Sequence, residues 1–247
     1  MLLLKMVQPK WLLATLLVLL GTAFCIRLGI WQLDRLDGRR AFNKQVETMR
    51  TLPALNLNQE AFDAIDEMEW RAVTVSGTYD FEHQIAIRNQ YHDNQYGYHL
   101  LTPLRFNETA VLVDRGWIPA DSNSAPADWR KFDETGEVIV TGQLRLGAAK
   151  PAFGGVEDVM PENGSRLDVW NNADITRIAS QIPYPILPVY IQPNPQVEDV
   201  EPPIPFQPQI ELTEGPHIGY ALQWFTFATI LFFGYPFYIR KQEESSP

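Results

Sequence analysis

The hydrophobic positions of the chain gather in two blocks, one near each end, and leave a polar middle. The second block, residues 218–239, contains no charged residue, and at about 1.5 Å per residue a helix of this length crosses the hydrocarbon core of a membrane. The first block, residues 11–26, reaches that length when it continues to Leu33, with the long Arg27 side chain extending toward the membrane surface. We therefore predict transmembrane helices at residues 11–33 and 217–239.

The sidedness of these spans follows from the charges beside them. A cleaved signal peptide is the alternative for the first block, but no small-x-small cleavage motif precedes Arg27. The basic residues around the two spans disagree about orientation, and we give more weight to Arg240 and Lys241, which favour a cytoplasmic C-terminus. Residues 1–10 and 240–247 are then cytoplasmic, and residues 34–216 form an extracytoplasmic domain. Because no Arg-rich and Ser-rich leader precedes Trp11, we expect a multi-pass protein of a bacterial plasma (inner) membrane.

The polar middle alternates between polar and apolar positions, which is typical of strands with one buried face. Its first part, residues 35–50, has a helical pattern and continues the first span as a stalk, and residues 59–68 fit a short helix with Asn58 as N-cap. Another short helix is expected at residues 174–181, with Asp174 as its cap. Predicted strands cover residues 72–79, 84–88, 98–105, 111–114, 138–146 and 187–191. The fold class is α+β: two transmembrane helices flanking a β-rich, mainly antiparallel domain.

Residues 183–208 hold nine of the 19 prolines of the chain, which excludes a regular helix there. We expect this stretch to be a stiff, extended connector that holds the domain at a set distance from the second span. A proline-rich ligand for a partner protein is the alternative.

Composition excludes several classes of function. The net charge of −10 is opposite to what a nucleic-acid-binding surface needs, so no nucleic-acid partner is expected. The single cysteine, Cys25, excludes an intramolecular disulfide and a thiolate metal cluster. No nucleotide-binding motif and no nucleophile elbow is present, so we name no catalytic residue and predict that the chain is not an enzyme.

His217 stands at the start of the second span and is the most informative of the four histidines. On a helix it shares one face with Tyr220, Ala221, Trp224 and Phe227. A neutral imidazole at this position is a suitable ligand for iron. The lane of aromatic and small side chains that follows it on the same helix face suits a flat apolar macrocycle. The alternative is a simple anchor, since histidine and tyrosine are at home where water meets lipid.

A basic stripe on the first span complements this lane, because Arg27, Trp31, Arg35 and Arg39 recur every four residues. Such a stripe would pair with carboxylates such as macrocycle propionates, and it fits the phosphates of membrane lipids equally well. The other histidines, His83, His92 and His99, have no compact ligand spacing, and Asn94 and Gly97 indicate a hairpin turn between them rather than a metal site.

The order of several segments resembles the surfeit locus protein one family. The segments that carry the resemblance are Gly29-Ile30-Trp31-Gln32-Leu33 with Arg35, Gly77-Thr78-Tyr79, Gly97 with Thr102-Pro103-Leu104, Val113 to Pro119, Gly142-Gln143-Leu144, and His217 with Tyr220 to Phe225. This chain reads Asp114-Arg115-Gly116-Trp117 where the family usually has Asn-Arg-Gly-Trp, and Glu214-Gly215-Pro216 where an Asn commonly precedes the histidine.

The resemblance implies a membrane protein with two spans and an outward domain that assists assembly of haem-copper cytochrome c oxidase. Some bacterial members of that family are considered haem a binders, and the family's histidine falls on His217, its aromatic followers on Tyr220 and Trp224, and its Trp-Gln pair on Trp31 and Gln32. The implied partners are oxidase subunit I, other assembly factors, haem a and membrane lipids.

We accordingly predict an assembly factor that assists haem a insertion into subunit I, or stabilises that subunit. The candidate cofactor-binding residues are His217, which is also the candidate iron ligand, and Tyr220, Trp224, Trp31, Arg27 and Arg35. A scaffold for oxidase assembly that binds no haem is the alternative, and a membrane-anchored hydrolase is a third hypothesis that no residue supports.

Overall fold

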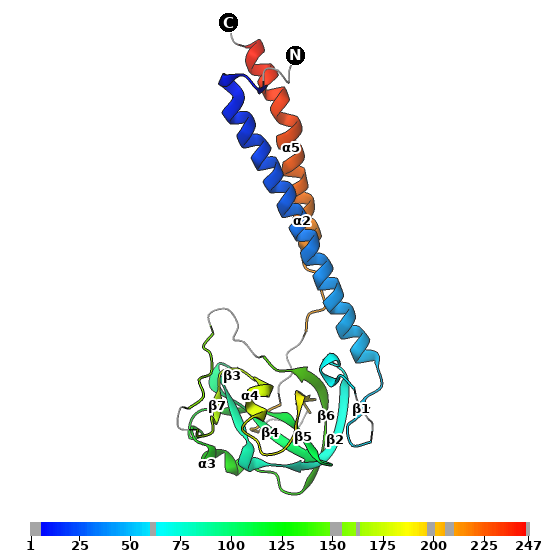
Figure 1. Cartoon of the computed structure of the whole chain (residues 1–247), viewed down its shortest axis with the longest axis vertical. Helices are drawn as coiled ribbons and strands as arrows, with labels where there is room; N and C mark the ends of the chain where they lie inside the picture. Colours follow the sequence, from blue (N-terminus) through cyan, green and yellow to red (C-terminus); the bar gives the residue numbers. More distant parts are fainter. Residues whose placement is uncertain are drawn as a thin grey trace. The chain divides into compact units, whose positions relative to one another are not determined.

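In the computed structural model, the described residues are 6–59, 63–148, 155–161, 164–196, 201–205 and 210–245. The chain forms two compact units (Figure 1). One consists of Met1–Gln45 and Glu211–Pro247 and is helical, and the other, Val46–Ile210, is rich in β-structure. This division follows packing, whereas the division predicted from the sequence follows depth in a membrane, so the two sets of boundaries differ.

The helical unit is built from α2, Pro9–Thr51, and α5, His217–Glu244. Each is long and apolar enough to cross a membrane, and only 22% and 11% of their most apolar windows are buried within the chain, unlike the core helix of a soluble protein. The stalk predicted for residues 35–50 is part of α2, which continues without a break through the first predicted span.

The two helices run antiparallel and side by side (Figure 1). Near the ends of the chain, Lys10 donates to Glu243 at 3.0 Å, and the hydroxyls of Thr15 and Tyr235 lie 2.8 Å apart. At the other end of the pair, Gln32 meets His217. These contacts fix which residue of α2 lies opposite which residue of α5.

The seam between the helices follows a seven-residue spacing. On α2 the buried positions are Thr15, Thr22, Cys25, Gly29, Leu36 and Asn43, and on α5 they are Ala221, Ala228, Tyr235 and Ile239. Hydrophobic spacing near 3.5 residues keeps two helices in contact over a long distance. Small residues bring the backbones close: a Cβ at Gly29 would lie 2.6 Å from Cε1 of Phe225.

The β-rich unit contains eight strands: β1 Leu55–Asn56, β2 Ala72–Tyr79, β3 Ile85–His92, β4 Gln95–Phe106, β5 Thr109–Pro119, β6 Glu137–Leu146, β7 Val169–Trp170 and β8 Ile186–Pro193. They form one sheet in the order β1-β2-β6-β8-β5-β4-β3-β7, and β2 also pairs with β4. This extra pairing closes β2, β6, β8, β5 and β4 into a ring. The predicted α+β class with mainly antiparallel strands is confirmed, although β1–β2, β3–β7 and β5–β8 are parallel and the sheet is mixed.

The unit buries both faces of its central strands. One core, which includes Val75, Leu104, Val113 and Ile191, fills the inside of the ring. A second core on the other side of the sheet packs Leu101 and Leu112 against Trp170 and the short helix α4, Ile175–Ala179. Strand β5 is therefore buried at nine consecutive positions, so the one-sided burial predicted for residues 111–114 is wrong. The remaining short helices are η1 Ile65–Glu67, η2 Phe81–His83, α3 Pro126–Trp129 and η3 Arg130–Phe132.

The two short helices predicted in this unit have different outcomes. The helix at residues 174–181 is confirmed as α4, and the Asp174 side chain accepts the Arg177 N–H as its cap. In residues 59–68, of which 60–62 lie outside the described residues, the described part forms only the three-residue helix η1. Asn58 is not an N-cap: its amide exchanges two 2.8 Å hydrogen bonds with the backbone of Ser76 on β2.

The proline-rich stretch confirms the strand predicted at residues 187–191 and differs from the predicted connector. Residues 186–193 are strand β8, held between β5 and β6, so this part is not a free connector. The pairing register with β5 shifts between Ile186 and Tyr190, a segment that contains Pro188, because proline has no N–H to give to a ladder. Ile204 then exchanges two backbone hydrogen bonds with Trp117, and residues 197–200 and 206–209 lie outside the described residues.

The Asp114–Trp117 segment contains a β-bulge. Leu100 and Leu101 of β4 pair with Gly116 and Asp114, which leaves Arg115 as the extra residue, and Gly116 has a φ of +121°. Arg115 is turned into the unit, where its guanidinium donates to Glu134 at 2.6 Å and lies over the Tyr79 and Phe81 rings. The Arg-Gly-Trp motif thus has a structural function in this unit.

The three histidines of this unit do not converge. His83 contacts Asp80, His92 stacks on Trp117, and His99 contacts Asp114. The predicted hairpin is confirmed between β3 and β4, but its turn is Asp93–Asn94, both with positive φ, and Gly97 lies within β4.

Candidate functional site

The candidate site lies in the helical unit, where α5 begins beside α2. His217 is the first residue of α5 and is half-buried. Its Nδ1 lies 2.9 Å from Oε1 of Gln32. This contact joins the most informative predicted residue to a neighbour that is 185 positions away in the sequence.

Three side chains of α2, those of Arg39, Asn43 and Arg40, attach the segment that leads into α5. Arg39 donates to the carbonyl oxygens of Thr213, at 3.0 Å, and of Glu211. Asn43 donates to the carbonyl oxygen of Leu212 at 3.0 Å. The backbone in front of His217 is therefore held along residues 211–213.

Arg40 adds an ion pair to this attachment. Its Nε and Nη2 donate to the two carboxylate oxygens of Glu214 at 2.7 and 2.9 Å. The hydrogen bond from Arg40 lowers the pKa of Glu214, and the same pair raises the pKa of Arg40. Both side chains are exposed, so the pair orients the segment more than it stabilises it.

A cavity of about 610 Å³ opens beside His217. Its lining comes from α2 and from the segment before α5: Asp34, Arg35, Gly38, Arg39, Phe42, Thr213, Glu214, Gly215 and His217. Small-molecule sites usually measure about 300–1,000 Å³, so the volume suits a cofactor-sized ligand. The cavity contains one imidazole, the guanidinium groups of Arg35 and Arg39, and the carboxylates of Asp34 and Glu214. Arg39 binds backbone carbonyls and Glu214 is paired with Arg40, so the imidazole and Arg35 are the groups suited to a metal centre and a ligand carboxylate.

Three of the six predicted cofactor-binding residues, Trp31, Arg35 and Tyr220, lie on one side of the helix pair. Trp31 precedes Gln32, which contacts His217 on α5, and Arg35 precedes the seam residue Leu36, so both are turned about 100° away from the facing helix. Tyr220 precedes the seam residue Ala221 in the same way on α5. Because the helices are antiparallel, both turns point to the same side of the pair.

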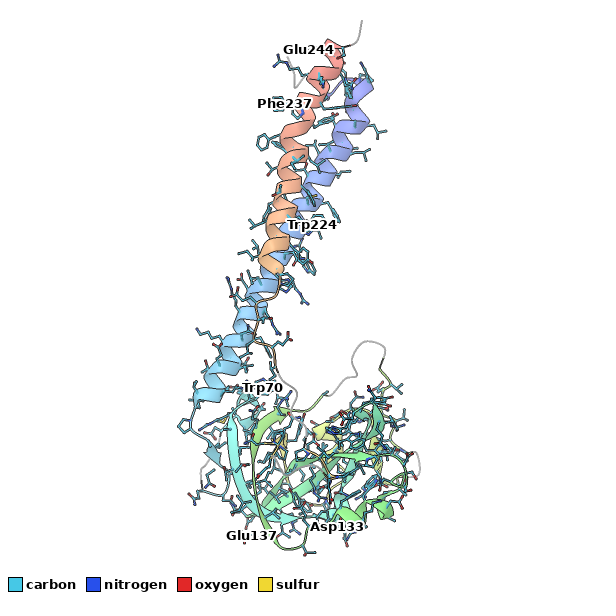
Figure 2. The ribbon with its side chains drawn as sticks, turned by 180° about the vertical axis from the view of Figure 1, so that it is seen from behind. Trp70, Asp133, Glu137, Trp224, Phe237 and Glu244 are labelled. Atoms are coloured by element: carbon cyan, nitrogen blue, oxygen red, sulfur yellow. The ribbon has the colours of Figure 1, made fainter. Side chains whose placement is uncertain are left out.

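Two of these residues are exposed aromatic side chains, Trp31 with 46% and Tyr220 with 48% of its surface accessible. Trp224, labelled in Figure 2, is half-buried one turn further along α5. Its ring meets that of Phe227 edge-on, with 5.9 Å between the ring centroids. Within the described part of the chain, the guanidinium groups of Arg27 and Arg35 make no hydrogen bond or ion pair and are open to a carboxylate.

The lane below His217 differs from its prediction in one respect. Ala221 is 1% exposed, because it faces α2 in the seam. It is a packing residue. The accessible part of the lane is the strip that carries Tyr220 and Phe227.

Sequence reasoning missed two features of the site. It did not pair Gln32 with His217, and it did not connect Arg39, Arg40 and Asn43 to the segment before α5. A signal for the first exists in the seven-residue spacing, because Gln32 follows the buried Cys25 by seven positions. No local pattern indicates the second, because Arg39 and Asn43 bind backbone carbonyls, which every residue type has, and Arg40 pairs with the distant Glu214.

Comparisons with known proteins agree with these observations. Residues 19–229 match the SURF1 family. A SURF1-like protein of Rickettsia felis is 25% identical over 231 residues, covering 92% of this chain and 96% of the relative. A SURF1-like protein of Caenorhabditis briggsae is 24% identical over 250 residues, covering 92% of this chain and 75% of the relative.

An uncharacterized SURF1-like protein of Mycobacterium tuberculosis is 22% identical over 255 residues, covering 98% of this chain and 90% of the relative. The family match begins inside α2, includes the whole β-rich unit and ends inside α5. It therefore contains both Gln32 and His217. This chain belongs to the SURF1 family.

Proposed function

We propose that the chain is an assembly factor for haem-copper cytochrome c oxidase that holds haem a at the start of α5 and assists its insertion into subunit I or the stabilisation of that subunit. Membership of the SURF1 family supports a role in oxidase assembly at the level of the family. The observation that supports the haem part is the half-buried His217 imidazole, which lies beside a cavity of about 610 Å³ that Arg35 also lines.

Each candidate residue has a distinct task in this proposal. His217 would ligate the iron, Arg27 and Arg35 would pair with the propionates, and Trp31, Tyr220 and Trp224 would cover the macrocycle. Haem a supplies redox chemistry to the oxidase, and this chain would only carry and orient it. A binder of this kind lowers the concentration of a free, reactive and apolar cofactor.

The same proposal places the chain in a bacterial plasma membrane with the β-rich unit outside the cytoplasm. The two apolar helices support membrane anchoring, and the candidate residues lie where the first predicted span ends and the second begins. Subunit I, other assembly factors and membrane lipids are the expected neighbours. Protease added to intact spheroplasts should cleave the β-rich unit, and protection of that unit would contradict the orientation.

The haem proposal is tested by the absorption spectrum of the full-length protein, purified in detergent from cells that make haem a. We expect the parent protein to carry haem a and the His217→Ala variant to lose it. His92→Ala is a matched control, because His92 stacks on Trp117 in the other unit. A His217→Ala protein with the haem absorption of the parent, or a parent protein without haem, refutes the ligand role.

A scaffold for oxidase assembly without haem contact is the second candidate. It is favoured by the burial of Ala221 in the seam, which removes part of the surface predicted to cover a macrocycle. A scaffold predicts that His217→Ala supports oxidase assembly as well as the parent in cells that lack the chromosomal gene. A haem carrier predicts a loss of assembled oxidase with this variant.

A further inference from the structure

The pair formed by Gln32 and His217 restricts the chemistry of the imidazole. Nδ1 of His217 lies 2.9 Å from Oε1 of Gln32, which is hydrogen-bond distance. A carboxamide oxygen carries no hydrogen and only accepts, so with this oxygen facing the ring the proton of the bond belongs to Nδ1. The opposite tautomer would set two lone pairs against each other.

A neutral imidazole has one N–H group and one nitrogen with a lone pair. With the proton on Nδ1, the lone pair belongs to Nε2. Histidine ligands of metals almost always donate their other ring N–H to a carboxylate, carbonyl or water, which fixes both the tautomer and the orientation of the ring. The carboxamide of Gln32 is an acceptor of this kind.

The position of Gln32 is fixed by the packing of α2. Gly29, one turn earlier, lies against the Phe225 ring, and Leu36, one turn later, is 3% exposed. On the facing helix, Ala221 follows His217 by one turn and is also buried in the seam. Small and closely packed residues on either side therefore set the distance that the carboxamide spans.

The position of His217 is fixed from the other direction by the segment before it. Gly215 has a φ of +68°, a conformation that glycine adopts without strain, and a Cβ there would lie 3.4 Å from Cδ2 of the His217 ring. The N–H of Tyr220 donates to the carbonyl oxygen of Pro216 at 3.1 Å and starts the helix. The first turn of α5, and with it the imidazole of His217, therefore has a defined position along α2.

We propose that Gln32 is a positioning residue for His217: its carboxamide oxygen holds the Nδ1–H tautomer and leaves Nε2 as the nitrogen that ligates the iron of haem a. This inference rests on the proposed haem-binding function and assigns a task to a residue that touches no ligand itself. Because the carboxamide is uncharged, it makes the imidazole a weaker electron donor than a carboxylate partner would.

The experiment uses the full-length protein, purified in detergent with haem a, and two substitutions. Gln32→Met keeps the length of the side chain and removes the acceptor, and we expect haem a affinity about 10- to 100-fold lower. Gln32→Glu keeps an acceptor and adds charge, and we expect haem to stay bound with a lower midpoint reduction potential. Gln45→Glu, at an exposed position of α2, controls for the added charge and should leave the potential unchanged.

The reduction potential distinguishes a positioning role of Gln32 from simple support of the helix pair. If Gln32 only supported the pair, its substitution would loosen the helices and lower haem a occupancy, and the carboxylate of Gln32→Glu would cause no specific change in the potential. An unchanged potential in Gln32→Glu, or an unchanged affinity in Gln32→Met, overturns the role of Gln32. If His217→Ala retains haem a, the proposed function fails first. If His217→Ala loses haem a and both Gln32 variants behave as the parent, only the present inference fails.

Discussion

The bulge at Gly116 provides a stringent test of the β-rich unit. Gly116 has a φ of +121°, and a Cβ added there would lie 2.3 Å from the carbonyl carbon and oxygen of Ile204. Trp117 and Ile204 exchange two backbone hydrogen bonds of 2.8 and 2.9 Å next to this point. The substitution Gly116→Ala therefore strains the backbone and also displaces the segment that contains Ile204.

The expected cost is the sum of these two effects. Strain at a positive φ in a non-glycine residue costs about 1–3 kcal/mol. Loss of two hydrogen bonds adds about 0.5–1.5 kcal/mol each, so Gly116→Ala should lower the free energy of unfolding by roughly 2–6 kcal/mol in total. Gly136→Ala is the matched control, because Gly136 has a φ of +99° and a Cβ there meets nothing within 4 Å.

The assay is urea unfolding of the full-length protein in detergent, followed by tryptophan fluorescence. Glutamate-specific proteolysis at the exposed Glu201 reports separately on the attachment of the Ile204 segment. The reduced entropy of the unfolded chain is common to both alanine variants and cancels in their difference. Equal destabilisation by Gly116→Ala and Gly136→Ala, with Glu201 equally protected, would refute the collision with Ile204.

Two further predictions concern a carboxylate and the helix seam. Burial acts to raise the pKa of Asp80, but hydrogen bonds from Tyr184, His83 and a backbone N–H outweigh burial and lower that pKa. The ionised carboxylate therefore stabilises the fold above about pH 4. This contribution is lost as the pH falls further, through the lowered pKa of the folded state. Urea unfolding should show Asp80→Asn less stable than the parent at pH 7, with a smaller difference at pH 3, and an equal difference at both pH values contradicts this assignment. Ala221→Leu overfills the seam and should destabilise the helix pair by about 1–3 kcal/mol and lower haem a occupancy, measured by thermal unfolding and absorption in detergent. Leu222→Ala, at a 63% exposed position, is its control, and equal effects of the two variants would refute the seam.

Local patterns in the sequence were enough to predict most elements. The apolar blocks and their lengths predicted both long helices, and the alternation of residues 72–79 predicted β2 with its exact bounds. These patterns succeed because burial on one face of a helix or strand leaves a period in the sequence. Asp174 was recognisable for the same reason, since a helix cap needs only its own next turn.

Burial on both faces leaves no such period. Strand β5 is covered by two cores, so its sequence gives no alternation, and its true length from Thr109 to Pro119 was missed. The middle of strand β8 was predicted at residues 187–191, but its prolines led local rules to assign the surrounding residues 183–208 to an extended connector. Only the neighbouring strands β5 and β6 supply the hydrogen bonds that make residues 186–193 a strand.

The candidate site, like the fold, was predictable from the sequence only in part. The residue types and their spacing along each helix are enough to indicate His217, Trp31 and Arg35 as candidates. The pairing of Gln32 with His217 depends on how far the two helices are shifted along each other, which Thr15 and Tyr235 help to fix from the other end of the pair.

The sequence by itself determined the two apolar helices, the β-rich middle and the side chains available to a cofactor, because each depends on residues close together in the chain. Only the tertiary structure decided that β2 and β4 close the ring, that Arg115 occupies a bulge, and that Gln32 meets His217. These features depend on groups brought together from distant positions, and the free energy of such contacts leaves no periodic pattern in a single sequence.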